Sequence, residues 1–281
     1  MDHLITRVGV VAREDRPPAI RLGRRVIEHL LSRGLETLAP PALAKGIESP
    51  KLLECEPEEM EADFVVAIGG DGLILRLCML LKEPETPILG VNMGTRGLLT
   101  EVSPRDVFKA LDMVLAGQCS YERYTKIASE INGARLPDAL NEIVVTSAQP
   151  SKLLTIRVLY DGQELFVIKG DGVIVSTPMG STAYSLSLGG PAVDPEVKAF
   201  VITPMSPFYP TPPVVVPDDS ALSIQLIKAK VTPLVVIDGS HTFEMKGGQE
   251  VVLKKSEKGA VFIRLGESSF VKRLRGRVYR P

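Results

Sequence analysis

The sequence predicts a parallel α/β domain over residues 1–117, followed by a mostly β domain over residues 118–265. In the first part, short β-branched or apolar runs alternate with stretches of helical spacing, the order that gives a layered parallel sheet. After Gly117, short strand-like runs follow one another with turns between them. A chain of 281 residues, 44% of them hydrophobic, is long enough for two domains that each bury a core. Whether residues 266–281 return to the first domain stays open.

Strand and helix signals alternate through the first part. The expected strands cover residues 7–12, 64–68 and 88–91, and the expected helices cover residues 19–33, 73–82 and 104–115. Gly34 is expected to end the first of these helices, because glycine adopts the left-handed conformation of a helix end without steric cost. The run at 64–68 leads through Gly70-Asp71-Gly72 into the next helix, an order of strand, tight turn and helix. Continuous apolar strands of this kind are typical of parallel sheets buried on both faces.

Strand-like runs fill the second part, at residues 126–131, 143–146, 153–160, 165–169, 173–176, 214–216, 222–226, 234–237 and 250–254. Asn132-Gly133 and Asp161-Gly162 lie between such runs and predict hairpin turns, since both dipeptides accept positive φ angles. No internal repeat of about 20–50 residues is visible, which argues against solenoid and propeller folds.

Charge and hydropathy limit the partners. A formal net charge of −1 argues against a nucleic-acid footprint over the whole chain. We interpret the basic residues near the C-terminus as a solvated helix face: Lys272, Arg273, Arg275, Arg277 and Arg280. The first residues lack a basic stretch followed by an apolar one, and no apolar run reaches transmembrane length. We therefore expect neither a nucleic acid nor a membrane as a partner.

The cysteines and histidines are scattered singly. Cys55, Cys78 and Cys119 are odd in number and form no Cys-x-x-Cys, so we expect reduced thiols and a cytoplasmic protein. None of the histidines has the spacing of a metal site, which argues against a zinc hydrolase: His3, His29 and His241. The chain also lacks the Gly-x4-Gly-Lys-Ser/Thr and Gly-x-Gly-x-x-Gly phosphate loops and the Gly-x-Ser-x-Gly elbow, so those enzyme classes are not indicated.

The turn at Gly70-Asp71-Gly72 follows a buried strand, at the sheet edge where ligands bind in open α/β folds. Its glycines would allow positive φ angles and present N–H groups to phosphate oxygens, aided by the helix that begins there. Asp71 would then act on a hydroxyl group or a metal ion. A surface turn capped by an aspartate is the alternative interpretation of this motif taken alone.

Two further motifs suggest a nucleotide ligand. Gly170-Asp171-Gly172 runs into residues 176–191, which are rich in small and hydroxyl side chains and contain one aromatic ring, Tyr184. This composition suits close backbone approach to a polar ligand that carries rings. Asn141 and Glu142 open an apolar strand, where an amide can bind a base edge and a carboxylate can bind ribose hydroxyls. Taken alone, that pair is more often a turn at the start of a strand.

In this order and spacing, the motifs resemble the NAD kinase family. The residues that carry the resemblance are Gly69-Gly70-Asp71-Gly72, Asn92-x-Gly94-x-x-Gly97-x-Leu99-Thr100, Asn141-Glu142 and residues 170–191. The match spans residues 64–240, and its last block is the most specific. The resemblance implies a Rossmann-like parallel α/β domain followed by a β-sandwich-like domain, in agreement with the prediction from the residues themselves.

The activity implied by the resemblance is transfer of the γ-phosphoryl group of ATP, or of polyphosphate, to the 2′-hydroxyl of the adenosine ribose of NAD, giving NADP. Mg²⁺ or another divalent metal would bridge phosphate oxygens. We name no metal-ligating residues, because Mg²⁺ keeps water and substrate oxygens as ligands. A homodimer or homotetramer is expected, since oligomers are usual in the family.

The resemblance also implies the site residues. Asp71 would be the proton acceptor, or the carboxylate that orients the hydroxyl, and Arg76 would add charge near a phosphate unless it is only a helix-surface arginine. Tyr184 would stack on a ring. The expected nucleotide-binding residues are Gly70, Asp71, Gly72, Arg76, Asn141, Glu142, Lys152, Lys169, Asp171, Thr182, Ala183, Tyr184, Ser185, Leu186, Ser187, Ser206 and Ser240.

The chain departs from the family pattern at several positions, which leaves the phosphoryl donor open. Leu73 and Met179 stand where the family commonly has threonine, and Phe208 stands where it often has histidine. Two alternatives to an NAD kinase remain. One is another kinase with the same Gly-Gly-Asp-Gly turn, such as a lipid kinase or a phosphofructokinase. The other is a dinucleotide-binding regulator without catalysis.

Overall fold

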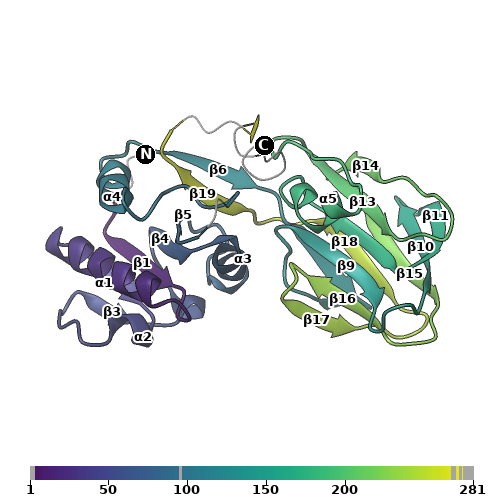
Figure 1. The fold of residues 1–281 in the computed structure, drawn as a ribbon, viewed down its shortest axis with the longest axis horizontal. Helices are drawn as coiled ribbons and strands as arrows, with labels where there is room; N and C mark the ends of the chain where they lie inside the picture. The colour runs from purple at the N-terminus through teal and green to yellow at the C-terminus, as the bar shows by residue number, and fades with distance from the viewer. Residues whose placement is uncertain (1–3, 95–96, 267–269, 272–273, 275–281) are drawn as a thin grey trace. The chain divides into compact units, whose positions relative to one another are not determined.

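The computed structural model describes residues 4–94, 97–266, 270–271 and 274, and the chain divides into two compact units (Figure 1). The first unit comprises Met1–Arg123 and Ala260–Pro281, and the second comprises Tyr124–Gly259. The basic residues 272, 273, 275, 277 and 280, which we expected on a helix face, lie outside the described residues, as do His3 and residues 95–96.

A parallel sheet forms the centre of the first unit, with the strand order β3-β2-β1-β4-β5-β19-β6. Its strands are β1 (Arg7–Ala12), β2 (Glu36–Ala39), β3 (Leu52–Glu54), β4 (Phe64–Gly69), β5 (Ile88–Asn92), β6 (Ser120–Tyr124) and β19 (Ala260–Arg264). The pairs from β3 to β19 are all parallel. β4 is buried along its whole length, as its continuous apolar sequence predicts.

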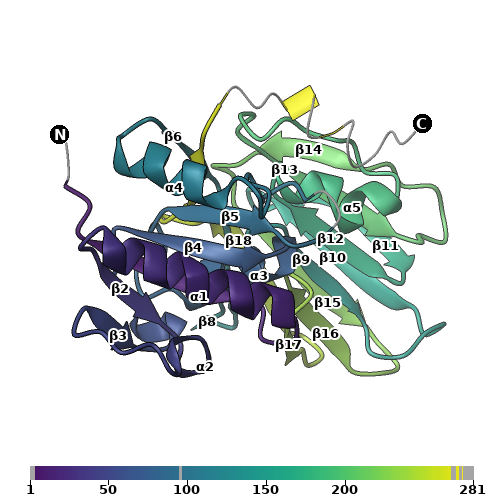
Figure 2. The same ribbon diagram turned by 60° about the vertical axis from the view of Figure 1, so that its left-hand side comes forward.

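Helices cover both faces of this sheet (Figure 2). The helical segments are α1 (Pro17–Ser32), α2 (Pro41–Ala44), the 3₁₀ turn η1 (Pro57–Glu59), α3 (Asp71–Leu80) and α4 (Val107–Leu115). α1 and α4 share one core with Val8, Val66 and Leu89 of the strands. α3 lies on the other face of the sheet from α1 and α4. Its Ile74 packs against Gly90, which directly follows Leu89 in β5, and consecutive residues of a strand face opposite sides of the sheet.

The second unit consists of two antiparallel sheets, with the strand orders β11-β10-β15-β18-β7-β8 and β14-β13-β12-β9-β16-β17. β10 lies against β12 and β11 against β13, so the sheets pack face to face as in a sandwich. The bounds are β7 (Ile127–Ile131), β8 (Ala134–Arg135), β9 (Glu142–Ser147), β10 (Leu154–Tyr160), β11 (Gln163–Gly170), β12 (Gly172–Ser176), β13 (Ala199–Met205), β14 (Val214–Pro217), β15 (Leu222–Lys228), β16 (Pro233–Ile237), β17 (His241–Glu244) and β18 (Glu250–Lys255). A 3₁₀ turn, η2 (Gly180–Thr182), and a short helix, α5 (Tyr184–Ser187), follow β12.

The predicted turns occur where their residues require them. Asn132 and Gly133 have φ angles of 49° and 79°, and Asp161 and Gly162 have 48° and 78°, as a type I′ hairpin turn needs. Gly34, with φ at 79°, ends α1. There the N–H of Leu35 donates to the carbonyl of Leu30, and that of Gly34 to Leu31, which is a Schellman motif.

The boundary between the units differs from the expected one at residue 117. β6 and β19 both belong to the sheet of the first unit, although they were counted within 118–265. β19 joins β5 in parallel, with Phe262 opposite Ile88. The pairing of β19 with β5 cannot be predicted from local sequence, because turn residues indicate only strands that pair as neighbours in a hairpin. The predicted fold class itself, a parallel α/β part and a mostly β part, is confirmed.

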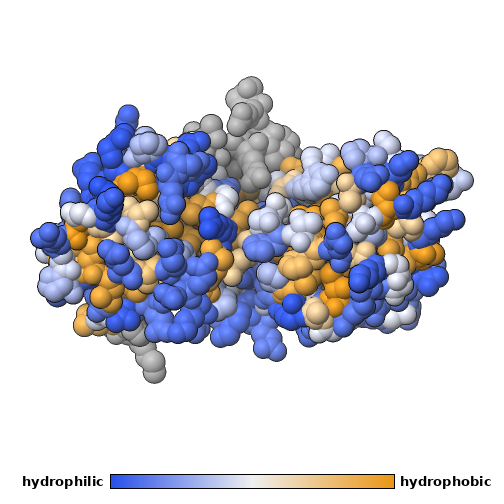
Figure 3. All heavy atoms as spheres, turned by 90° about the horizontal axis from the view of Figure 1, so that it is seen from below, coloured by the Kyte–Doolittle hydropathy of each residue, from blue (hydrophilic) through white to orange (hydrophobic). Residues whose placement is uncertain are grey.

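The surface is mixed in character. Figure 3 shows one face of the molecule, on which hydrophilic residues (blue) and hydrophobic residues (orange) are interspersed. Within the described part of the chain, we find no helix with the length and hydropathy that crossing a bilayer requires.

Candidate functional site

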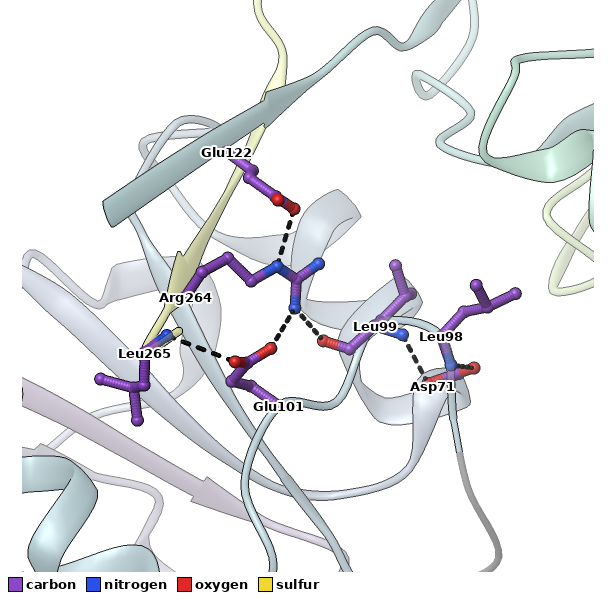
Figure 4. Close-up of polar contacts among 7 residues, drawn as sticks. All are labelled: Asp71, Leu98, Leu99, Glu101, Glu122, Arg264 and Leu265. Carbon is purple, nitrogen blue, oxygen red and sulfur yellow. Dashed lines mark hydrogen bonds and ion pairs between the residues drawn. The ribbon is translucent and has the colours of Figure 1, made fainter. Parts of the chain in front are cut away.

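Asp71 lies at the carboxyl edge of the parallel sheet, as the first residue of α3 and directly after β4 and Gly70. Its two carboxylate oxygens accept hydrogen bonds from the backbone N–H groups of Leu98, at 2.9 Å, and Leu99, at 3.1 Å (Figure 4). The loop after β5 is therefore attached to the turn that carries the aspartate. Each carboxylate oxygen has more than one acceptor position, so the group can still accept a bond from a ligand.

A cavity of about 360 Å³ opens beside Asp71. Its walls are mostly glycine backbone with two arginines, and the residues are Arg13, Arg16, Gly69, Gly70, Asp71, Gly72, Asn92, Met93, Gly94 and Gly97. Arg16 donates to the carbonyl of Met93 at 3.3 Å, while Arg13 is paired with Asp15. Two guanidinium groups and the N-terminus of α3 make this cavity suited to an anion with several oxygens, such as a phosphate chain.

The glycines at this edge serve different needs. A Cβ atom on Gly70 or Gly72 would meet no protein atom within 4 Å, so these positions leave open space next to Asp71. A Cβ atom on Gly97 would overlap the Asp71 carboxylate and lie 2.7 Å from Oγ1 of Thr100. The expectation of positive φ angles at Gly70 and Gly72 is wrong, because Gly70 is extended, with φ at −143°, and Gly72 belongs to α3. Space for a ligand, rather than backbone conformation, accounts for glycine at these two positions.

Arg76 faces a second cavity on the same unit, of about 550 Å³. Arg13 and Gly72 line both cavities, and Arg76 is exposed one turn into α3. Arg76 is therefore near the Asp71 cavity but does not line it.

In the second unit, Asn141 and Glu142 are held at the start of β9 by Asp238. The carboxylate of Asp238 accepts hydrogen bonds from the N–H groups of Leu140, Asn141 and Glu142, at 2.8, 2.8 and 3.0 Å. Asp238 and Glu142 are both buried. Burial raises the pKa of the Asp238 carboxyl, and the three N–H bonds lower it by a smaller amount.

The segment after β12 packs against the same strand start. The Thr177 hydroxyl donates to the carbonyl of Leu140 at 2.6 Å, and the Thr177 N–H donates to the carbonyl of Asn141 at 2.9 Å. Gly180 lies so close that a Cβ atom there would overlap the Asn141 carbonyl. The structure therefore brings Asn141, Glu142 and η2 together.

A second group of expected residues lies at the other end of β9. Glu142 is opposite Ser176 and Thr146 is opposite Gly172, so this end is about 13 Å away at 3.3 Å per residue. Here the N–H of Asp171 donates to the Met205 carbonyl at 2.9 Å, and the ammonium of Lys169 lies 5.6 Å from the ring centre of Phe208. Ser206, with φ at 43°, follows Met205, whereas Lys152 is exposed in the turn before β10. Gly170-Asp171-Gly172 is thus the passage from β11 in one sheet to β12 in the other.

The residues from Thr182 to Ser187 connect these two groups. Thr182 is buried and donates to the Met179 carbonyl, and Ser185 is buried against Oγ1 of Thr203, at 2.7 Å. Tyr184 is 45% exposed, which leaves its ring available for stacking. Ala183 and Leu186 are half-buried and Ser187 is exposed. Ser240 is exposed beside Asp238 and contacts Nδ1 of His241 at 3.0 Å, so this histidine has a protein partner.

Sequence reasoning missed three kinds of residue at these places. Arg13 and Arg16 line the Asp71 cavity, and their position directly after β1, at the same sheet edge, is a signal that could have identified them. Asp238 belongs to Asp238-Gly239-Ser240, which resembles a motif of the family, but no local pattern reveals that it binds Asn141 and Glu142, almost a hundred positions away. Arg264, described below, is likewise visible only in three dimensions.

We expect replacement of Asp238 by asparagine to lower stability, because an amide offers one acceptor oxygen where three N–H groups are bound. An unsatisfied buried donor costs about 1–3 kcal/mol, or a Tm decrease of roughly 3–10 °C. Thermal unfolding of Asp238→Asn measures it. Asp161→Asn is the matched control, since Asp161 caps the N–H of Ala221 at 2.9 Å on the surface.

The pH dependence of this difference follows from the raised pKa of Asp238. A carboxyl group with a higher pKa in the folded state contributes stability that is present below its ordinary pKa of 3.8 and is lost as pH rises through the folded value. The Tm difference between the wild type and Asp238→Asn should therefore shrink as the pH rises above 3.8, the ordinary pKa of the carboxyl group. A difference that grows with pH would contradict this assignment.

The Asp71 cavity fits a divalent cation that arrives with a phosphate chain. Its wall offers one carboxylate, while the described residues contain no group of three or more His, Cys, Asp or Glu side chains that could hold a metal ion. Mg²⁺ usually binds through one or two carboxylates together with substrate oxygens and water. Asp71 is thus the residue that would hold such a cation from the protein side.

Comparison with known proteins places these features in a family context. The ATP-NAD kinase N-terminal domain matches residues 8–119, and the ATP-NAD kinase C-terminal domain matches residues 140–265. An NAD kinase from Methanothermobacter thermautotrophicus is 42% identical over 269 residues, covering 95% of this chain and 94% of that protein. One from Thermococcus gammatolerans is 38% identical over 267 residues, covering 94% and 96%.

Two solved structures resemble the chain over nearly its whole length. An NAD kinase from Archaeoglobus fulgidus in complex with ATP has a TM-score of 0.79 and 32% identity, covering 96% of this chain and 99% of that one. A yeast NADH kinase complexed with NADH has a TM-score of 0.89, covering 98% and 87%. At 22% identity, the yeast protein shows the shared fold alone.

Proposed function

This chain belongs to the ATP-NAD kinase family, and from that premise we propose that it transfers the γ-phosphoryl group of ATP to the 2′-hydroxyl of the adenosine ribose of NAD, giving NADP. The observation that carries the proposal is Asp71, a carboxylate fixed by two backbone N–H groups in a cavity walled by glycines and two arginines. The other two interpretations of the sequence, a lipid kinase or phosphofructokinase and a regulator without catalysis, are not favoured by these relatives.

Asp71 performs the proton chemistry in this proposal. Its carboxylate accepts the proton of the ribose hydroxyl, or orients that hydroxyl for attack on the phosphorus atom. The bonds from Leu98 and Leu99 fix the direction of the carboxylate, so little reorganisation is needed when the hydroxyl arrives.

The rest of the Asp71 cavity holds phosphates. Arg13, Arg16 and the N-terminus of α3 attract the polyphosphate chain and compensate its negative charge. Mg²⁺ or another divalent cation, which Asp71 would hold from the protein side, would neutralise part of the negative charge of the phosphate chain. Because phosphoryl transfer depends mainly on positioning and charge compensation, these residues suffice for the chemistry without a covalent intermediate.

The second unit binds NAD in this proposal. Asn141 would bind the adenine edge and Glu142 the ribose hydroxyls, at the end of β9 that Asp238 holds. The other end of β9 offers Lys169, Asp171 and Ser206. The segment 182–187 packs against β13 through Ser185. A dinucleotide has two nucleosides joined by a pyrophosphate, so one molecule can contact both groups.

The direct test is NADP formation by the purified protein from NAD, ATP and Mg²⁺, with polyphosphate as a parallel donor and NADH as a parallel acceptor. Turnover supports the proposal, and the rate ratio between donors gives the donor preference that Leu73 and Met179 leave open. If the protein binds NAD but forms no NADP with either donor, the proposal is wrong and a regulator takes its place.

The substitution Gly72→Ala distinguishes an effect on ligand binding from an effect on the stability of the fold. A methyl group there meets no protein atom within 4 Å, and alanine in a helix is more stable than glycine by about 0.5–1 kcal/mol. We therefore expect an equal or higher Tm together with a decrease of about tenfold or more in kcat/KM for ATP, since the methyl occupies space beside Asp71. Initial rates and thermal unfolding measure the two effects. An unchanged kcat/KM would mean that phosphates do not pass Gly72.

We also propose a homodimer or homotetramer and a cytoplasmic location. The location is supported by Cys55, Cys78 and Cys119, which are all free thiols, as in a reducing compartment. Light scattering coupled to size-exclusion chromatography tests the assembly, and a mass of one chain would contradict it.

A further inference from the structure

Arg264, at the end of β19, has only 1% of its side chain exposed. In the sequence it follows all of the motifs named above, the last of which ends at residue 240. A buried guanidinium is costly unless charged and polar partners surround it. Its Nε donates to Glu122 on β6 at 2.8 Å, and its Nη1 donates to the carbonyl of Leu99 at 3.2 Å and to Glu101 at 3.3 Å (Figure 4). One side chain thus joins β19, β6 and the loop after β5.

Leu99 connects this network to Asp71. Its carbonyl accepts the bond from Arg264, and its N–H donates to the Asp71 carboxylate at 3.1 Å. The residue after β19 makes a second contact with the same loop, since the N–H of Leu265 donates to Glu101 at 3.3 Å. Figure 4 shows Arg264, Leu99 and Asp71 in one continuous chain of contacts.

From this geometry we propose that Arg264 is a positioning residue of the phosphoryl transfer, which sets the direction of the Asp71 carboxylate through Leu99. The inference rests on the proposed function. A competing explanation is that the loop is already fixed by β5, where the N–H groups of Glu101 and Val102 both bind the carbonyl of Gly90. In that case Arg264 would contribute only stability.

The substitution Arg264→Lys distinguishes a positioning role of Arg264 from a purely stabilising one. Lysine keeps the positive charge, but a single ammonium cannot reproduce the fork that reaches Glu122 on one side and Leu99 with Glu101 on the other. We expect kcat to fall about tenfold, with KM for NAD and for ATP changed less than about twofold, because a displaced carboxylate weakens the transition state more than binding. Glu122→Gln is the matched control: it keeps an acceptor for Nε and leaves the Leu99 contact in place, so it should lower Tm without lowering kcat.

A double-mutant cycle shows whether Arg264 acts through Asp71. The residual kcat should be the same in Asp71→Asn and in the double mutant Asp71→Asn/Arg264→Lys, because neither variant has the Asp71 carboxylate that Arg264 orients. Amide hydrogen exchange in a peptide covering residues 97–102 should be faster in Arg264→Lys than in the wild type, and unchanged in Glu122→Gln.

Every outcome of these experiments either supports the inference about Arg264 or overturns it. Full kcat in Arg264→Lys, an equal loss in Glu122→Gln, independent losses in the double mutant, or unchanged exchange overturns the inference. An inactive wild type in the same assay overturns the proposed function and the inference with it, whereas an active wild type isolates the inference. If circular dichroism shows that Arg264→Lys does not fold, Glu101→Gln replaces it under the same criteria. It keeps Arg264 but weakens the two bonds that Glu101 accepts, from Nη1 of Arg264 and from the N–H of Leu265, which both join the loop to the end of β19.

Discussion

We expect the replacement of Asp71 by asparagine to lower kcat by about 10²–10⁴-fold, the range for loss of a general base. The amide has nearly the same shape but cannot take a proton, and it presents an NH₂ group where the N–H of Leu98 or Leu99 now donates. We expect KM for NAD to change little, because the residues proposed to bind NAD lie in the second unit. Initial rates of NADP formation at saturating ATP and NAD measure the loss.

The chain offers a matched control for this substitution. Asp63 also binds two consecutive backbone N–H groups, those of Thr6 at 2.7 Å and Arg7 at 2.9 Å, outside the Asp71 cavity. Both N–H groups donate to the same oxygen, Oδ2, so the amide oxygen of an asparagine can keep both bonds, and Asp63→Asn should change Tm little and leave kcat unchanged. If Asp71→Asn keeps more than about a tenth of the wild-type kcat, Asp71 is not the general base.

Gly180→Ala is expected to have the largest effect in the second unit. The new Cβ atom would overlap the backbone carbonyl of Asn141, which is itself held by the N–H of Thr177 at 2.9 Å. A backbone carbonyl cannot rotate away as a side chain can, so the start of β9 must shift. Forcing atoms into a packed site costs about 1–3 kcal/mol, and a shifted Asn141 and Glu142 should raise KM for NAD by about tenfold or more.

Gly247→Ala serves as the control for that prediction. A Cβ atom on Gly247 would meet nothing within 4 Å, and Gly247 has no positive φ angle, so neither Tm nor KM should change. Thermal unfolding and NAD saturation curves measure the pair. A Gly180→Ala enzyme with unchanged KM for NAD would show that the strand start at Asn141 does not bind the dinucleotide.

Local patterns were sufficient for most of the fold. The apolar run of β4, the end of α1 at Gly34 and the type I′ dipeptides each depend on residues close in sequence, which is why the sequence predicts them. The expected strands do not include β2, β3, β6, β8, β13, β17 and β19. β19 in particular is recognised only by its partner β5, and pairing between distant strands depends on the assembled sheet.

The same distinction applies to the site. Asp71 could be predicted because a motif and the sheet-edge rule both point to it. Asp238 and Arg264 could not, since their partners lie far away in the sequence and their effect passes through backbone atoms of any residue type. Side chains that bind main-chain groups of other segments leave no pattern in the segments they hold.

The position of β19 between β5 and β6 has a consequence for how the protein is made. A ribosome synthesises β6, then all of the second unit, and only then Ala260–Arg264. Until that strand emerges, β6 lacks the neighbour that joins it to β5, and the loop of Leu99 lacks the side chain that grips it. The sheet of the first unit is therefore completed only after the second unit has been synthesised. A chain stalled before Ala260 would carry the whole Gly-Gly-Asp-Gly turn and still lack the arginine that binds Leu99.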